Sequence, residues 1–183
     1  MTSDSLTPDS SIANIRVKIR HATAEDIPAI IDLERACATA AHWSEAQYRQ
    51  SFEASGPERI VFVAVSEGAP TPADAEASPD TAFAGFLMAR RVAPDWELEN
   101  IVVAPDARRK GLGKQLLEAL IIRARETNSE SVFLEVRESS EDARALYEKA
   151  GFRQVGTRKS YYANPLEAAI LYRFRLEVKP FSK

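Results

Sequence analysis

Four stretches of the chain carry the apolar spacing of amphipathic helices. The longest predicted helix follows the glycines near residue 111, and its apolar residues recur every three to four positions: Leu112, Leu116, Leu117, Leu120, Ile121 and Ala124. A helix that starts near Thr23 has an apolar stripe that also includes an acid, with Ile27, Ile30, Ile31 and Glu34 along it. Ser44-Glu-Ala-Gln47 is a capping box that predicts a third helix, and residues 142–150 predict a short one closed by Gly151.

Seven further stretches have the composition of strands. Residues 59–66 are apolar on both faces, which predicts a central strand, whereas residues 15–20 alternate as an edge or half-buried strand does. The other predicted strands are 83–92, 96–103, 131–137, 152–162 and 169–176, with a loop over 163–168 joining the last two. The order β-α-α-β-β-β-α-β-α-β-β predicts an α/β protein whose mixed sheet has helices on its faces.

Length and composition predict one globular domain. The chain has 183 residues, 45% of them apolar and 28% charged, which is enough to bury a core. We expect this domain to span residues 15–178, with a disordered polar leader over 1–14. Residues 67–82 contain three prolines among small and acidic residues, and they predict a flexible surface insertion.

Charge and cysteine content restrict the partners and the location. The net charge of −3 argues against a nucleic-acid-binding protein, because it gives no basic excess to neutralise phosphates. No segment approaches the roughly 18 apolar residues of a membrane span, and residues 1–14 lack the features of a signal peptide. The single cysteine, Cys37, cannot form an internal disulfide. We therefore expect a cytoplasmic protein that binds no membrane, requires no metal and is a monomer or a weak dimer.

The junction between the strand at 96–103 and the long helix has the composition of an anion site. A helix start offers unpaired N–H groups and partial positive charge. Gly111 and Gly113 would let phosphates approach the backbone closely, and four cations surround the same point: Arg108, Arg109, Lys110 and Lys114. These features predict a diphosphate ligand, with a plain glycine turn beside a solvated basic cluster as the alternative.

The Arg108-x-x-Gly111-x-Gly113 sequence resembles the acetyl-CoA pyrophosphate loop of the GCN5-related N-acetyltransferases. A second block, Phe133-Leu-Glu-Val-Arg-Glu-Ser-Ser140 followed by Ala145-Leu-Tyr-Glu-Lys-Ala-Gly-Phe152, extends the resemblance toward the bacterial ribosomal-protein alanine N-acetyltransferases. The resemblance covers roughly residues 15–176. It implies the acyl-CoA N-acyltransferase fold, with a mixed, mostly antiparallel sheet of about six to seven strands and about four flanking helices. It also implies acetyl-CoA as co-substrate and a primary amine as acceptor.

Two carboxylates are candidates for the general base. Glu135 lies inside an apolar strand, where burial would raise its pKa toward the working range, and it matches the proton-acceptor position of the resembled family. The alternative for Glu135 is a salt bridge to an arginine such as Arg137 or Arg173. Glu97 matches the base of histone-type members. Glu97 and Glu99 are expected on one face of their strand, with Trp96, Leu98 and Asn100 on the other; a relay through Glu97 and Glu135 is also possible.

The remaining cofactor-side predictions follow from the resemblance. Tyr147 matches the acid that protonates the CoA sulfur, with core packing as the alternative role. The pantetheine arm would pair with Ile101, Val102 and Val103, and the diphosphate would lie on backbone amides from Arg109 through Leu112 to Lys114. Ser140 stands where the family usually has an asparagine that contacts the cofactor, so this contact is predicted to be lost or water-bridged.

The acceptor side is predicted from Trp43, Tyr161 and Tyr162. Trp43 is either a hydrophobic staple before the helix or a wall of the acceptor groove, and the tyrosine pair matches the region that closes over a peptide N-terminus. His42 and Ala168 depart from the resembled alanine-specific pattern. The resemblance implies a protein or peptide N-terminal α-amine as acceptor, with a ribosomal small-subunit protein as the candidate partner. The alternatives are a small amine, or a non-catalytic CoA-binding module.

Overall fold

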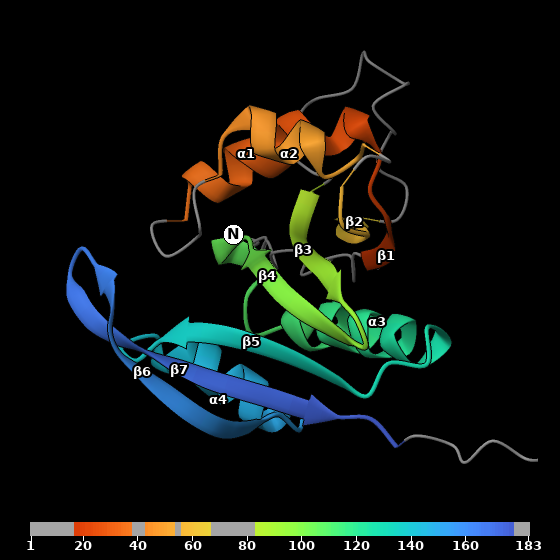
Figure 1. Ribbon diagram of the computed structural model, residues 1–183. Coiled ribbons are helices and arrows are strands. Elements are labelled where there is room, and N and C mark those ends of the chain that lie inside the picture. Colours follow the sequence, from red (N-terminus) through yellow and green to blue (C-terminus); the bar gives the residue numbers. More distant parts are fainter. Residues whose placement is uncertain (1–16, 38–42, 54–55, 67–82, 178–183) are drawn as a thin grey trace, which may run out of the picture.

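The computed structural model describes residues 17–37, 43–53, 56–66 and 83–177, so the predicted leader, His42 and the predicted insertion lie outside the described residues. A seven-stranded sheet has the order β1-β2-β3-β4-β5-β7-β6 (Figure 1). Its strands are β1 Val17–His21, β2 Arg59–Ser66, β3 Phe83–Val92, β4 Asp95–Val103, β5 Ser131–Arg137, β6 Arg153–Ala163 and β7 Leu166–Arg175. The helices are α1 Ile27–Arg35, α2 Glu45–Gln50, α3 Leu112–Glu126 and α4 Glu141–Lys149, with 3-10 turns η1 Ala24–Asp26 and η2 Pro105–Ala107.

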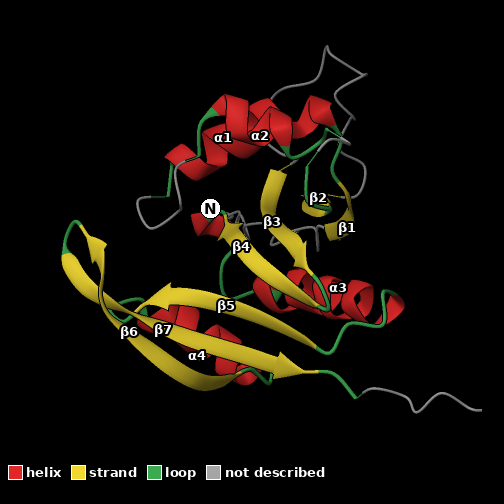
Figure 2. Ribbon diagram, viewed as in Figure 1, coloured by secondary structure: helices red, strands yellow, loops and turns green. Residues whose placement is uncertain are grey.

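The helices cover both faces of the sheet (Figure 2). α1 and α2 bury their apolar faces against β2, β3 and the end of β4, around Ile30, Tyr48 and Phe86. α3 packs on the opposite face, where Leu116, Leu120 and their neighbours meet the sheet, and Tyr147 of α4 joins the same core. The predicted order of elements and the mixed, mostly antiparallel sheet are confirmed.

The sheet has a gap between its two parallel strands. β4 and β5 pair only at their beginnings, from Trp96 opposite Val132 to Leu98 opposite Leu134. Both strands then continue, β4 to Val103 and β5 to Arg137, each paired with its other neighbour, β3 or β7. Between the diverging ends, among the described residues, the facing backbone edges have no strand partner.

A bulge in β4 lies beside the start of this gap. Met88 of β3 is opposite Asn100, whereas Ala89 is opposite Leu98, so Glu99 is an extra residue in β4. An extra residue reverses which face the following side chains occupy. Asn100 therefore contacts Glu34 and Tyr48 on the α1/α2 face. The prediction that Asn100 shares a face with Trp96 and Leu98 is wrong, because period-two counting does not anticipate the bulge.

The hairpin of β6 and β7 is longer than the sequence predicted. Ala163 pairs with Leu166, so only Asn164 and Pro165 separate the strands, and the predicted loop over 163–168 is largely strand. The pairing shifts between Arg158 and Tyr162, where Ser160 has a φ of 53°. This irregularity rotates the end of β6, and the tip of the hairpin curves toward the side of the sheet that carries α1 (Figure 2).

Candidate active site

The loop before α3 has the backbone of an anion site. Arg109 and Gly111 have φ angles of 59° and 83°, both in the left-handed region, and Gly111 is the residue that precedes the first turn of α3. A residue without a Cβ adopts this conformation at no steric cost. The first N–H groups of the 15-residue helix that follows have no partner within the helix, and they attract anions. Phosphate binding at this loop stays a prediction.

Arg108 makes, and Gly113 permits, contacts within the protein that the sequence did not predict. The Arg108 Nε donates to the carbonyl oxygen of Val103 at 3.1 Å, and a guanidinium nitrogen lies 3.5 Å from the Cys37 Sγ. Arg108 thus connects the loop to the end of β4, and its contact with a ligand stays a prediction. A Cβ on Gly113 would lie 2.9 Å from Cδ2 of Leu146, so a larger residue there would require the Leu146 side chain to move. Gly113 thus lies where α3 contacts α4, and the approach of a ligand to it stays a prediction.

The other cations around the loop are exposed. Lys114 is 3.3 Å from Glu118 one helical turn away, in a pair that solvent screens. No ion pair of Arg109 or Lys110 occurs within the described residues. Arg109 and Lys110 are therefore the two cationic side chains that remain available beside the start of α3.

Glu135 lies beside the gap, one residue after the last position at which β5 pairs with β4. Its side chain is 17% exposed, and Arg158 Nη1 of β6 lies 2.6 Å from its Oε1. The predicted alternative for Glu135, a salt bridge to an arginine, is thus present, but its partner is Arg158 of β6 and not Arg137 or Arg173. Glu135 faces away from the α3 core, because its neighbours Leu134 and Val136 are buried in that core. A proton acceptor at this position is open to the α1/α2 side of the sheet.

Glu97 and Glu99 are each held by arginines of neighbouring strands. Arg90 Nε donates to Glu97 at 2.6 Å, and Arg59 Nε donates to Glu99 at 2.9 Å. Glu97 also lies within the paired part of β4, opposite Phe133. Glu135 is therefore placed beside the gap, and Glu97 is not.

Tyr147 approaches from the opposite face. It is 5% exposed, and its ring lies 6.1 Å from Tyr172 and 6.0 Å from Phe152, centroid to centroid. Burial raises the pKa of the Tyr147 hydroxyl, and the Tyr162 hydroxyl adds to the rise. Burial also raises the pKa of Tyr162, with Glu135 contributing in the same direction against Arg137. Tyr162 thus lies within electrostatic reach of both Glu135 and Tyr147, and Tyr147 retains its proton.

An ion pair fixes the tip of the hairpin to the segment before α4. Arg137 Nη1 donates to Glu167 at 2.6 Å, and its guanidinium carbon lies 4.0 Å from the Tyr162 ring centroid. The second Glu167 oxygen accepts from the Ser139 N–H at 3.1 Å. These contacts, Arg137 foremost, hold the pKa of Glu167 below its ordinary value. Ser140, the next residue, is half-buried at the start of α4, and its hydroxyl does not cap the helix.

The Trp43 backbone contacts the buried carboxylate of Glu34, a residue that was not among the predicted site residues. The Trp43 ring lies 5.8 Å from that of Tyr48, as in a hydrophobic staple, while its backbone N–H donates to Glu34 at 2.9 Å. Glu34 is 1% exposed and also accepts from Asn100. An acid within the apolar stripe of α1 was the sequence signal for this contact.

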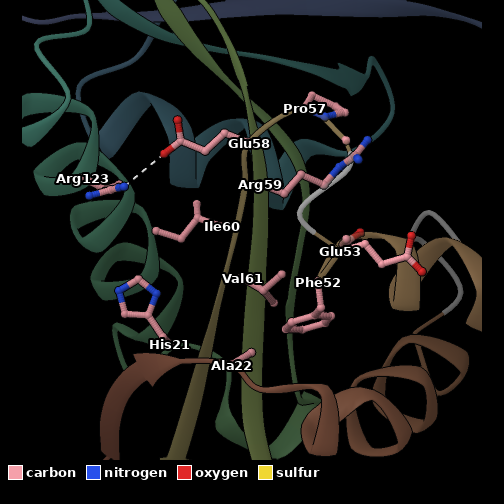
Figure 3. Close-up of a pocket in the computed structure, with 12 residues that line it drawn as sticks. His21, Ala22, Phe52, Glu53, Pro57, Glu58, Arg59, Ile60, Val61 and Arg123 are labelled. Carbon is pink, nitrogen blue, oxygen red and sulfur yellow. Dashed lines mark hydrogen bonds and ion pairs between the residues drawn. The ribbon is translucent and has the colours of Figure 1, made fainter.

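A cavity of about 520 Å³ lies apart from the gap. It is at the start of β2, where Glu58 pairs with Arg123 and Phe52 lies on the opposite side (Figure 3). β3 and β4 separate this strand from β5, so the cavity is not part of the gap. Within the described ranges there is no cluster of three potential metal ligands and no helix long and apolar enough to cross a membrane.

The mostly antiparallel sheet of seven strands, its four flanking helices and the glycine loop before the longest helix agree with the fold that the sequence resemblance implied. The family model of the acetyltransferase (GNAT) family matches residues 27–152, and the chain belongs to this family.

Two of the proteins similar to this chain are named ribosomal-protein alanine N-acetyltransferases. A ribosomal protein bS18 alanine N-acetyltransferase of Haemophilus influenzae is 43% identical over 81 residues, which are 44% of this chain and 55% of the relative. The chain thus spans about half the length of the curated relatives it matches. The crystal structure of the ribosomal-protein-S18-alanine N-acetyltransferase from Escherichia coli has a TM-score of 0.71 and 27% identity, covering 92% of this chain and 99% of that chain.

One solved structure of the same fold holds acetyl-CoA. Arabidopsis thaliana NAA60 in complex with acetyl-CoA has a TM-score of 0.72 at 14% identity, covering 88% of this chain and 100% of that chain. At this identity the comparison concerns the fold alone.

Proposed function

We propose that the chain transfers the acetyl group of acetyl-CoA to the N-terminal α-amine of a protein. The similar proteins are named ribosomal-protein alanine N-acetyltransferases, and these names support a protein as acceptor. The observation that carries the proposal is the gap between β4 and β5. Glu135 lies beside this gap and faces the α1/α2 side of the sheet, whereas Tyr147 is buried on the α3 side. A base and an acid on opposite faces of the sheet would suit a reaction whose two substrates enter from opposite sides.

The residues around the gap fit an acyl-CoA co-substrate, which supplies an activated acyl group. The backbone groups of Ile101, Val102 and Val103 that point away from β3 have no strand partner within the described residues, and they offer an edge for the amides of the pantetheine arm. The N–H groups from Arg109 to Lys114, with the left-handed Gly111, would hold the diphosphate. Arg109 and Lys110 would add charge.

In the proposed chemistry the protein moves two protons. Glu135 accepts a proton from the acceptor ammonium, because only the free amine is nucleophilic. The Tyr147 hydroxyl holds a proton for the departing sulfur, which is consistent with the raised pKa that keeps this phenol protonated. A backbone N–H at the free edge of β4 would polarise the acyl carbonyl.

The acceptor would bind on the α1/α2 side, between Trp43 and the hairpin residues Tyr161 and Tyr162. Glu135 lies on this side, and the Arg137–Glu167 pair holds the hairpin in place. Glu97 and Glu99 do not favour a small polyamine as acceptor, because arginines already neutralise them. A ribosomal small-subunit protein as partner and a cytoplasmic location are part of this proposal.

The test is thiol release from acetyl-CoA with a panel of acceptors. The panel contains an alanine-starting peptide, the same peptide with a blocked N-terminus and an internal lysine, a polyamine and an aminoglycoside. The proposal expects turnover with the free N-terminus alone. Turnover with the polyamine or aminoglycoside instead would assign a small-molecule enzyme. Binding of acetyl-CoA without turnover of any acceptor would favour the CoA-sensing alternative.

A further inference from the structure

Glu34 occupies a position that disfavours a carboxylate. It lies in the last turn of α1, where the helix dipole is negative, and it is 1% exposed. Within the described part of the chain no lysine, arginine or histidine forms an ion pair with it. Asp32, on the same helix, is exposed instead. An apolar residue would satisfy the packing of α1, so the reason for an acid lies in its contacts.

The two carboxylate oxygens bind different parts of the fold. Glu34 Oε1 accepts from Asn100 Nδ2 at 2.7 Å, and Oε2 accepts from the Trp43 backbone N–H at 2.9 Å. Asn100 is the residue that follows the extra residue of the β4 bulge, two positions after Leu98, where pairing with β5 ends. Trp43 precedes the cap of α2. One side chain thus joins α1, the start of α2 and the strand that borders the gap.

Tyr48 completes this arrangement from α2. Its hydroxyl lies 3.4 Å from Asn100 Nδ2, and its ring packs between those of Trp43 and Phe86. Burial, and then the Glu34 carboxylate, raise the pKa of the Tyr48 hydroxyl, so this group remains a neutral donor. Since an ionised carboxylate only accepts hydrogen bonds, Glu34 also determines that Asn100 presents its amide nitrogen.

We infer that Glu34 is a positioning residue for the acceptor: it holds Trp43 at a fixed place relative to the β4 side of the gap. The inference rests on the proposed function, because Trp43 is the proposed acceptor wall. Reaction rates respond steeply to small displacements of bound groups, so loss of this link affects acceptor use. The acetyl-CoA loop before α3 makes no contact with Glu34 and retains its affinity.

Three variants test the inference. Glu34→Met keeps the volume of the side chain and removes both oxygens that accept hydrogen bonds. In this variant the Michaelis constant for the alanine-starting peptide should rise by roughly tenfold or more. The affinity for acetyl-CoA, measured by calorimetry, should not change. Glu34→Gln keeps one oxygen that accepts a hydrogen bond from the Trp43 N–H. Its amide nitrogen can donate to Asn100 once the Asn100 amide has turned. The Michaelis constant of this variant for the peptide should therefore be close to the wild-type value. Asp32→Ala, an exposed change on the same helix, is the control and should change neither constant.

A second readout does not depend on activity. Hydrogen–deuterium exchange of the peptides that cover residues 43–50 should accelerate in Glu34→Met and not in Glu34→Gln or Asp32→Ala. If the wild type acetylates no amine, the proposed function fails, while this exchange comparison still decides the positioning link. The inference is overturned if Glu34→Met keeps the wild-type peptide Michaelis constant and exchange, or if it weakens acetyl-CoA and peptide binding equally.

Discussion

The substitution Gly85→Ala tests how firmly β4 is held at the border of the gap. Gly85 lies on β3 opposite Val103, and a Cβ there would lie 2.7 Å from the backbone carbonyl oxygen of Val102. Ordinary contact begins at 3.4 Å, so β4 must move away from β3 by about 0.7 Å. The obstructing atom is backbone, and no side-chain rotation relieves the contact. Overpacking of this kind costs roughly 1–3 kcal/mol of unfolding free energy, which lowers the Tm by about 2–12 °C.

The same displacement moves β4 into the gap and should weaken acetyl-CoA binding. Thermal unfolding and calorimetry with acetyl-CoA would measure both effects. Gly156→Ala in β6 is the matched control, because its Cβ would lie 3.9 Å from Leu171 Cδ2; it should keep the affinity and have an equal or slightly higher Tm. Equal Tm and equal acetyl-CoA affinity in the two variants would refute the reasoning.

Three other variants probe the remaining parts of the site and fold. Tyr147→Phe should lower kcat on the order of 10²–10⁴-fold while acetyl-CoA still binds; unchanged turnover in a stopped-flow thiol assay would remove Tyr147 from the mechanism. Gly111→Ala places a Cβ at a φ of 83° and should cost on the order of 1–2 kcal/mol in urea unfolding, with weaker acetyl-CoA binding; unaltered stability would contradict a strained loop. Burial alone would raise the pKa of Asp26, but Arg20 and then Thr23 hold it below its ordinary value. A lowered carboxyl pKa stabilises the fold above the unfolded value of about 3.9, and this stabilisation is lost as the pH falls through the folded value. Asp26→Asn should therefore be less stable than wild type at neutral pH, by a difference that shrinks on acidification in urea titrations; a constant difference would exclude the linkage.

The sequence predicted the elements with a long, regular apolar period. α3 has six buried apolar residues, and they are the six whose spacing predicted the helix. The alternation in β5 correctly separated the buried Leu134 from Glu135. These predictions succeeded because many residues contribute to a repeated pattern, so that no single contact decides which element forms.

The details that failed depend on single tertiary contacts. No glycine or proline in the sequence of β4 indicates the bulge at Glu99, yet the bulge moves Asn100 to the α1/α2 face of the sheet. The arginine that pairs with Glu135 is Arg158 of β6, a strand that is separated from β5 by β7 in the sheet. The contacts of Arg108 with the Val103 carbonyl oxygen and the Cys37 Sγ were likewise not predicted, and a phosphate contact of Arg108 stays a prediction. Charge pattern alone does not distinguish a ligand-binding cation from a structural one.

The irregular pairing in β6 has a further consequence for assembly. β6 is the boundary strand of the sheet, and unprotected boundary strands recruit other chains by extending the ladder. Here the ladder is broken after Arg158, and the exposed cations Arg153, Arg158 and Lys159 follow the same strand. Repulsion and broken periodicity together discourage an extra strand on the outside.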